Sequence, residues 1–200
     1  MYQWWKRYLI KNGRYYGIKN NENATLTITS GTVKSDQYAI YNDSTNTINI
    51  AGGNISALNS NYASTKYSIY NNVTADINIT GGTISCDSTY NNSYYGYGIY
   101  NNGDGNILIS TPNTITVKGG YGYGIYNNGE GNVTLEEGSI SVTGDILAYG
   151  IKNASKGKVE MAGGSISATS ASGVAYGIEN GTLGTIEITN GNITANTTEG

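Results

Sequence analysis

The pentapeptide Tyr-x-Ile-x-Asn occurs seven times in this chain of 200 residues, and its repetition limits the folds that the sequence can adopt. Successive copies lie 22 to 30 residues apart and begin at Tyr16, Tyr38, Tyr67, Tyr97, Tyr123, Tyr149 and Tyr176. Self-similarity at a period of about 20 to 50 residues predicts a solenoid, in which each repeat is one coil that buries its apolar face only against its neighbours. The repeats fill almost the whole chain, so we expect one elongated domain.

Three further sets of residues recur at fixed places when the repeats are aligned on the Asn of the pentapeptide. Six residues after the Asn stand Leu26, Ile48, Ile77, Ile107, Val133, Val159 and Ile186. Two residues later stand Ile28, Ile50, Ile79, Ile109, Leu135, Met161 and Ile188. After a turn stand Val33, Ile55, Ile84, Ile115, Ile140, Ile166 and Ile193. A period of two places the first two sets on the inner face of one strand, and the third set begins another.

Each repeat therefore carries three short strands, the first being the Tyr-x-Ile segment. This pattern predicts an all-β fold, a right-handed single-stranded parallel β-helix of about seven coils with three short strands each, in which every strand pairs with its counterpart one coil away. The handedness follows from the strong right-handed bias of parallel crossovers. The period is too short for a β-propeller, and no stretch reads as the helix of a leucine-rich repeat. Cys86 falls at a small inward position occupied elsewhere by Ala57 and Ala168, so we expect it to be buried.

Glycine and asparagine mark the corners of the expected coils. The turn between the second and third strands usually holds a glycine: Gly31, Gly53, Gly82, Gly138, Gly164 and Gly191. The residues Thr111 and Pro112 lengthen this turn in one repeat. The pentapeptides end in Asn20, Asn42, Asn71, Asn101, Asn127, Asn153 and Asn180. Asn tolerates left-handed backbone and its amide bonds to a copy above and below, so we expect a structural Asn ladder at one corner.

The composition excludes several classes of function. Charged residues make up only 12% of the chain and the net charge is −3, which argues against nucleic acid or an anionic membrane as partner. The chain has no histidine and one cysteine, so the commonest general base is missing and neither an intrachain disulfide nor a cysteine-based metal site can form. We expect no cofactor.

The ends of the sequence carry little information about export. No segment has the roughly 18 apolar residues of a membrane helix, and the first residues lack the apolar core and cleavage site of a signal peptide. We interpret residues 1–14 as a lead-in or cap segment and residues 15–200 as the repeat domain. We expect the chain to be a fragment of a longer protein, with any export signal or anchor outside it.

Two runs of the repeat, YGIYNNGEGNVTLEEGSISV and INITGGTISC, resemble the right-handed parallel β-helix, or pectin-lyase-like, repeats of bacterial adhesins and autotransporter passenger domains. The resemblance covers nearly the whole chain. It implies a secreted or cell-surface location and a structural, stalk-like or adhesive role, with glycans or host and cell-surface proteins as partners. The fold also carries polysaccharide lyases, hydrolases and phage tailspikes, so a carbohydrate-active or tailspike-like protein is the alternative.

The sequence offers little for catalysis. Lyases of this fold use outward carboxylates with Ca²⁺ and an Arg base, whereas this chain has only Arg7 and Arg14, both before the first full coil. Glu160 and Glu187 take equivalent outward positions in adjacent coils, at a spacing near that of a retaining glycosidase pair. No wall or second group is predicted around them, so we expect a solvated face and no enzyme activity. Asp104 and Glu130 stand in the matched turns NNGDGN and NNGEGN, and two stacked carboxylates with nearby carbonyls would suit Ca²⁺. The next coil places Lys156 there, so we expect no metal site.

Tyrosine is the most suggestive residue, with 19 copies in a chain without phenylalanine. The first Tyr of each pentapeptide shares the period of the Ile, so we expect it to point inward or to a corner. The fourth residue should point outward and is tyrosine in four consecutive coils: Tyr41, Tyr70, Tyr100 and Tyr126. Variable loops before this strand add further candidates, Tyr62, Tyr94 and Tyr95. Tyrosine is favoured at wet recognition surfaces, so these seven residues are the predicted binding surface, against a purely structural ladder as the other reading.

Overall fold

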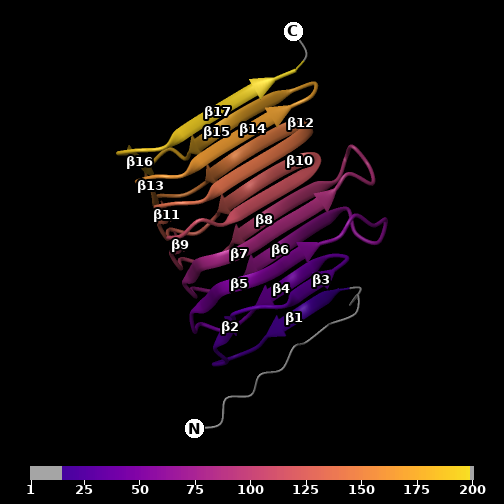
Figure 1. The fold of residues 1–200 in the computed structure, drawn as a ribbon, viewed down its shortest axis with the longest axis vertical. Helices are drawn as coiled ribbons and strands as arrows, with labels where there is room; N and C mark the ends of the chain where they lie inside the picture. The colour runs from indigo at the N-terminus through magenta and orange to yellow at the C-terminus, as the bar shows by residue number, and fades with distance from the viewer. Residues whose placement is uncertain (1–14, 199–200) are drawn as a thin grey trace.

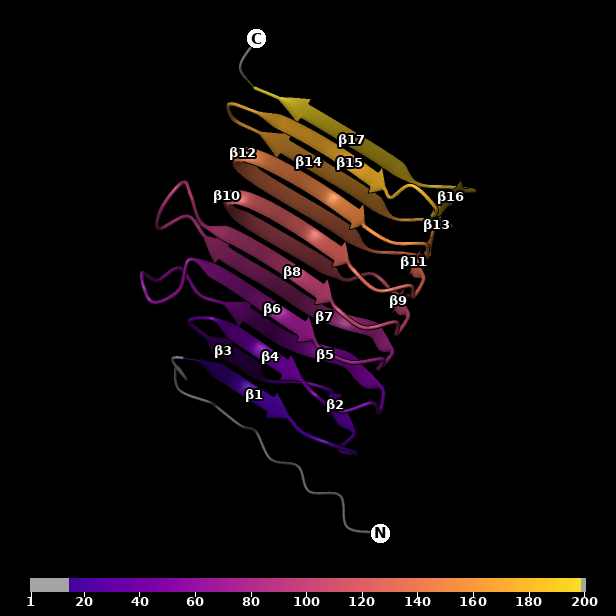
Figure 2. The same ribbon diagram turned by 180° about the vertical axis from the view of Figure 1, so that it is seen from behind.

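The computed structural model describes residues 15–198 and shows a parallel β-helix, as the repeat predicts (Figure 1). Seventeen strands stack into one continuous rod, with β1 and β17 at opposite ends (Figures 1 and 2). The described residues form no helix, and hence none long and apolar enough to span a bilayer. The predicted lead-in segment 1–14 lies outside the described residues.

Each coil contributes strand segments to three columns. The first column holds the pentapeptides, in β1 (Tyr16–Asn20), β4 (Tyr38–Asn42), β6 (Thr65–Asn71), β8 (Tyr95–Asn101), the ends of β10 (Thr114–Asn127) and β12 (Ser139–Asn153), and β15 (Val174–Asn180). The second column holds β2 (Leu26–Ile28), the starts of β5 (Ile48–Ala57) and β7 (Ile77–Ser88), β9 (Ile107–Ile109), β11 (Val133–Leu135), β13 (Lys158–Met161) and β16 (Thr185–Ile188). The third column holds β3 (Thr32–Ser35), the ends of β5 and β7, the starts of β10 and β12, β14 (Ser165–Ser170) and β17 (Asn192–Thr197).

The strands pair in the register that the sequence alignment predicts. Between β6 and β8, for example, Ile69 lies opposite Ile99 and Asn71 lies opposite Asn101. Six such coil-to-coil steps join the seven pentapeptides. The right-handed sense of the coil stays a prediction from the crossover rule.

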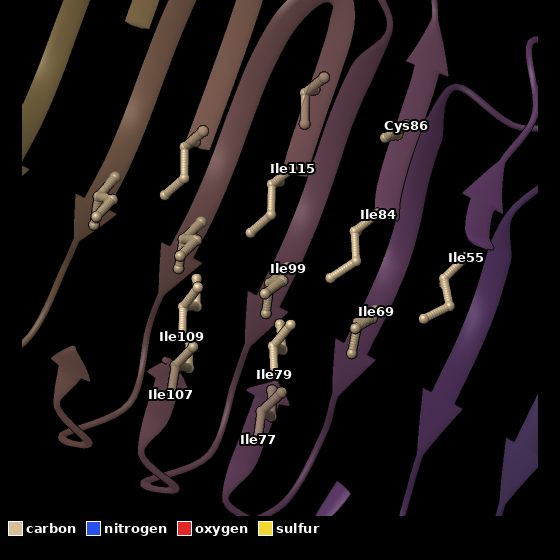
Figure 3. Packing of buried hydrophobic residues seen from close by; sticks show 14 of the residues in the cluster. Ile55, Ile69, Ile77, Ile79, Ile84, Cys86, Ile99, Ile107, Ile109 and Ile115 are labelled. Carbon is tan, nitrogen blue, oxygen red and sulfur yellow. The ribbon is translucent and has the colours of Figure 1, made fainter. Parts of the chain in front are cut away.

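The apolar ladders form the core of the rod. In coils two to six all three ladders are buried, and their side chains point into the space between the columns (Figure 3). Burying an Ile of this kind stabilises a fold by about 1.5 to 3 kcal/mol, so the ladders supply most of the driving force for stacking. Cys86 belongs to this core and lies in register with Ala57 and Val117, which confirms that it is buried.

Several of the expected short strands are continuous. β5 and β7 run from the second column into the third through paired glycines, and the β5–β7 pairing shifts register there. β10 and β12 run from the third column directly into the next pentapeptide. At these corners the strand runs on without a separate turn, although Gly53 and Gly82 adopt positive φ there; the division of each coil into three strands and turns did not predict this continuity.

The predicted glycine turns are confirmed in detail. All six glycines have positive φ, between 76° and 114°, and they are the glycines of the described chain that do so. A side chain rarely adopts such a φ, so glycine is the residue that this corner requires. The fourth coil has no glycine here, and the longer turn with Thr111 and Pro112 takes its place, separating β9 from β10.

The Asn ladder is present, but one part of its explanation was wrong. Each ladder amide donates from Nδ2 to Oδ1 of the Asn one coil further on, at 2.7 to 2.9 Å over all six steps. None of these residues has left-handed backbone, since Asn23 is the one non-glycine residue with positive φ among those described. Instead, each Asn ends a strand with its side chain turned inward. In most coils the same Nδ2 also donates to the carbonyl four residues later, as Asn101 does to Gly105.

Candidate functional site

The four outward tyrosines of the pentapeptides form one continuous stack. The ring centroids of Tyr41, Tyr70, Tyr100 and Tyr126 follow one another at 5.3, 5.1 and 5.0 Å, and successive ring planes differ by 5°, 8° and 1°. In-register pairing of the strands fixes this spacing, because each ring rises by one coil. We call these four residues the outer tyrosine column.

The first tyrosines of the pentapeptides form a second stack beside it. Their centroids are 4.7 to 5.4 Å apart over all six steps, from Tyr16 through Tyr38, Tyr67, Tyr97, Tyr123 and Tyr149 to Tyr176. None of them belongs to the apolar core cluster. The prediction left these rings inward or at a corner, and the structure places them outside the core cluster, with Tyr123 and Tyr149 buried and Tyr16 and Tyr176 exposed. We call these seven residues the inner tyrosine column.

The small residue between Tyr and Ile explains this arrangement. Ala39 and Ile40 are both buried, so strand alternation breaks between them and Tyr38 falls on the same outer face as Tyr41. In the fourth coil the residue between Tyr and Ile is Gly98. Its backbone packs directly against the third column, because a Cβ on Gly98 would lie 2.7 Å from Cγ2 of Ile115. Counting by twos from the Ile misses a break that only packing against the third strand reveals.

The two columns interlock as a herringbone. Tyr67 and Tyr70 have centroids 5.0 Å apart and planes 81° apart, and the planes of Tyr97 and Tyr100 meet at 84°. Edge-to-face contacts of this kind add about 0.5 to 1.5 kcal/mol each beyond area burial. Rings inside the columns have a tyrosine above and below. A ligand approaching from solvent therefore meets ring edges and hydroxyl groups rather than open ring faces. We call the two columns together the tyrosine surface.

Lysines stand at both ends of the outer column. Lys19 lies in register with Tyr41, and its Nζ is 5.8 Å from the centroid of that ring. Lys152 lies in register with Tyr126 and its Nζ sits 4.7 Å from the centroid of Tyr149. Lys152 also pairs with Glu179 of the next coil at 2.9 Å. Lys19 thus covers Tyr41 at one end of the outer column, and Lys152 covers Tyr149 of the neighbouring stack; both are favourable cation–π arrangements.

A row of polar side chains follows the outer column, two residues further along each strand. Asn72 donates from Nδ2 to Oδ1 of Asp43 at 2.9 Å, and Asn128 donates to Oδ1 of Asn102 at 3.1 Å, with a longer contact of 3.4 Å joining Asn102 to Asn72. The hydroxyl of Tyr70 lies 3.4 Å from Oδ1 of Asn72. We call Asp43, Asn72, Asn102 and Asn128 the amide row. The tyrosine hydroxyls and the amide row together offer both donors and acceptors along the rod.

Burial keeps several phenols of the tyrosine surface protonated over the physiological range. Burial is the largest cause that raises the pKa of Tyr100 and of Tyr123 to about 12, and charge on neighbouring tyrosines raises both values further while Lys152 lowers that of Tyr123. Burial also raises the pKa of Tyr70, and that of Tyr41 together with the nearby Asp43. The surface is therefore neutral apart from its ends, and its hydroxyls are available as hydrogen-bond donors.

The three loop tyrosines do not join the outer column. The ring of Tyr62 packs edge-on against Tyr15 at 5.3 Å, and Tyr94 lies 6.1 Å from Tyr90. Tyr95 stacks on Tyr121 at 4.6 Å as a separate pair. The loops 58–64 and 89–94 protrude on one side of the rod (Figure 1). The outer column is thus the part of the predicted surface that the fold brings together.

The carboxylates weighed for catalysis are engaged in ion pairs. Lys158 bridges Glu160 at 3.0 Å and Glu187 at 2.5 Å. Its hydrogen bond and positive charge lower the pKa of Glu187, which is the opposite of what a general acid needs. Glu130 pairs with Lys156 at 2.6 Å. Among residues 15–198 no group of three or more acidic or cysteine side chains is placed to hold a metal ion.

Lys66 is a buried charge that the sequence reading missed. Its side chain is 0% exposed, and Nζ donates to the carbonyl of Asp36 at 3.1 Å and to Oγ of Ser60 at 3.0 Å. Burial lowers the pKa of this amine. Lys66 lies in register with Gly96, just before the pentapeptide. The sequence signal for its burial was a lysine in an aligned column that otherwise holds small residues. The bonds tie the loop 58–64 to the preceding coil.

No protein-family model matches this chain, and no curated protein or solved structure is significantly similar to it.

Proposed function

We propose that this chain is a non-enzymatic β-helix segment of a secreted or cell-surface bacterial protein, with a structural and adhesive role. The rod holds its outer face rigidly, and the tyrosine surface makes the adhesive contact. The observation that carries the proposal is the outer tyrosine column lying beside the amide row, with both repeating once per coil. The pectin-lyase-like adhesin resemblance of the repeat supports the same reading.

The chemistry of this surface fits a polyhydroxylated ligand, such as a glycan on a cell surface. Phenol hydroxyls, amide groups and one carboxylate line up at intervals of about 5 Å, and they are pre-organised by hydrogen bonds and ring packing. Interior ring faces are covered, so we expect contact through hydroxyl groups and ring edges. A largely neutral surface implies binding that depends little on salt, in contrast to a charge-driven contact.

A test replaces hydroxyl groups without disturbing the packing. The double variant Tyr70→Phe, Tyr100→Phe retains both rings, and we expect it to lose most binding in a glycan-array or cell-binding assay. The matched control is Thr116→Val, Thr134→Val, which removes two half-exposed hydroxyls from the third and second columns. Equal binding by wild type and the tyrosine double variant, at unchanged melting temperature, would show that the column only packs.

A further inference from the structure

The outer tyrosine column and the amide row cover the same four coils. Each tyrosine is followed two residues later by a member of the row, in the pairs Tyr41–Asp43, Tyr70–Asn72, Tyr100–Asn102 and Tyr126–Asn128. Two residues along a strand return to the same face, about 6.5 Å away. In the second pair the hydroxyl of Tyr70 lies 3.4 Å from Oδ1 of Asn72, so the two groups meet at the surface. The surface is therefore a series of four polar subsites of the same construction, with a carboxylate in the first.

The series has a defined length. In the sixth coil Lys152 stands in register with Tyr126, and Ala154 takes the place of the next amide. Lys152 is held by Glu179 at 2.9 Å and lies over the ring of Tyr149. At the other limit Lys19 stands in register with Tyr41. Each coil rises by about 4.8 Å, so the four subsites span about 14 Å along the rod.

The hydrogen bonds of the amide row all run in one direction. Asn72 donates to Asp43, Asn102 donates to Asn72, and Asn128 donates to Asn102. An amide group has two N–H donors, and each of these asparagines uses one of them within the row. The second N–H of each amide can therefore donate to a ligand. Because every amide donates towards the preceding coil, the row distinguishes the two ends of a bound chain.

A linear glycan has the repeat and the polarity that these subsites require. An extended β-linked chain advances by one sugar ring at a time, a length close to the rise of one coil. Each ring carries hydroxyl groups that both donate and accept hydrogen bonds, and the two ends of the chain differ. A polypeptide strand advances about 3.3 Å per residue and would fall out of phase with the coils. Asp43 disfavours acidic sugars at the first subsite.

We propose that the tyrosine surface binds a linear, uncharged, β-linked oligosaccharide along the rod axis, with one sugar on each of four subsites. This inference rests on the proposed function and refines it by naming the ligand class, its direction and its length. The sugar hydroxyls exchange hydrogen bonds with the phenol and the amide of each coil. Because the subsites are alike, affinity grows by a similar factor with each sugar up to the fourth and then stops growing.

Cello-oligosaccharides of two to six sugars, titrated into the full chain in a calorimeter, test the length. Each sugar up to the fourth should tighten binding about threefold to tenfold, which is the effect of one net hydrogen bond. The fifth and sixth sugars should each add less than about twofold. Malto-oligosaccharides of the same sizes contain the same glucose units in a curved, α-linked chain. They should bind weakly and without this dependence on length.

A variant with a fifth subsite tests the boundary of the series. Lys152→Tyr, Ala154→Asn repeats in the sixth coil the pair of the fifth, and it should move the plateau from four sugars to five. The matched control is Glu160→Tyr, Ala162→Asn, which adds the same side chains to the second column of the sixth coil and also removes an ion pair. This control should leave the plateau at four sugars, with a melting temperature equal to that of the extended variant.

The outcomes separate this inference from the adhesive role. Affinity that does not change with chain length, equal binding of the two sugar series, or a plateau that stays at four sugars in the extended variant would each overturn the inference. If no oligosaccharide binds while Tyr70→Phe, Tyr100→Phe still lowers cell binding, the ligand class is wrong and the adhesive role stands. Cell binding that this double variant leaves unchanged would instead reject the proposed function.

Discussion

Asn101 donates its side-chain amide to Oδ1 of Asn127 in the next coil at 2.9 Å, and both side chains are fully buried. Asn101 also accepts from Asn71 and donates to the carbonyl of Gly105. Replacing it with alanine leaves buried donors and acceptors without partners, at about 1 to 3 kcal/mol for each group. We expect Asn101→Ala to lower the free energy of unfolding by about 3 to 5 kcal/mol in urea denaturation.

Asn20 provides the control for this prediction, because it donates to the ladder but accepts nothing from a described residue. Asn20→Ala should therefore cost less than Asn101→Ala. Equal costs at the two positions would mean that the ladder contributes through shape alone rather than through its chain of amide bonds.

The isoleucines of the ladders should contribute more to the free energy of unfolding inside the rod than in the last coil. Ile109→Ala removes a fully buried side chain and should destabilise the fold by about 2 to 5 kcal/mol, the usual cost of a core cavity. Ile188→Ala makes the same chemical change at a half-exposed position and should cost less than about 1 kcal/mol. Denaturant midpoints of the two variants, with unchanged slopes, decide this. Similar losses would indicate that Ile188 is covered in solution.

Cys86 should not react while the protein is folded. Its thiol lies in the core, and burial raises its pKa to about 12, so almost no thiolate exists near neutrality. We expect a thiol reagent to label the protein only as fast as it unfolds, with full labelling in denaturant. Cys86→Ala matches the residue at position 57 in the same column and should fold normally. Rapid labelling under native conditions would contradict the buried position.

The carboxylate pair should support no turnover. Lys158 bridges Glu160 and Glu187, and it holds the pKa of Glu187 below its ordinary value. A glycosidase pair needs one carboxylic acid that stays protonated. We expect no release of reducing ends or unsaturated products from a panel of polysaccharides. Turnover that disappears in Glu160→Gln but persists in the control Glu136→Gln would overturn the non-enzymatic reading.

The sequence alone was sufficient for the repeat architecture because the coils share one spacing rule, which only the turn with Thr111 and Pro112 breaks. The inward Ile positions, the six glycines with positive φ and the Asn ladder all follow from residue type at a fixed interval. In a solenoid each strand pairs with its counterpart one repeat away, so the interval between repeats determines the pairing. A register slip of two residues would place Asn against Ile in every coil at once.

The candidate surface was harder to predict because it depends on contacts between columns. The outer tyrosine column was found by alternation, whereas alternation left the inner column undecided between an inward and a corner position. The difference lies at Ala39, which turns inward beside Ile40 and sends Tyr38 outward. Lys66 was missed for a related reason, since its neighbours Ser60 and Asp36 come from a loop and from the preceding coil. Neither contact is visible in strand periodicity.

The tyrosine surface should make the protein sensitive to alkali. Burial and neighbouring phenols raise the pKa of Tyr100 to about 12 from an ordinary value of 10.0, and burial also raises that of Cys86 to about 12 from 9.0. Between the unfolded and folded values the unfolded chain loses these protons while the folded chain keeps them. The contribution of these groups to the free energy of unfolding is therefore fully present below about pH 9, and it is lost as pH rises toward 12. We expect the denaturant midpoint to decrease over this window, and phenolate absorbance to rise together with unfolding.

Cys86→Ala should remove the part of the loss that begins near pH 9, and Tyr70→Phe, Tyr100→Phe should reduce the part that begins near pH 10. Phenolate absorbance that rises fully near pH 10 in the folded protein would show that the columns are open to solvent.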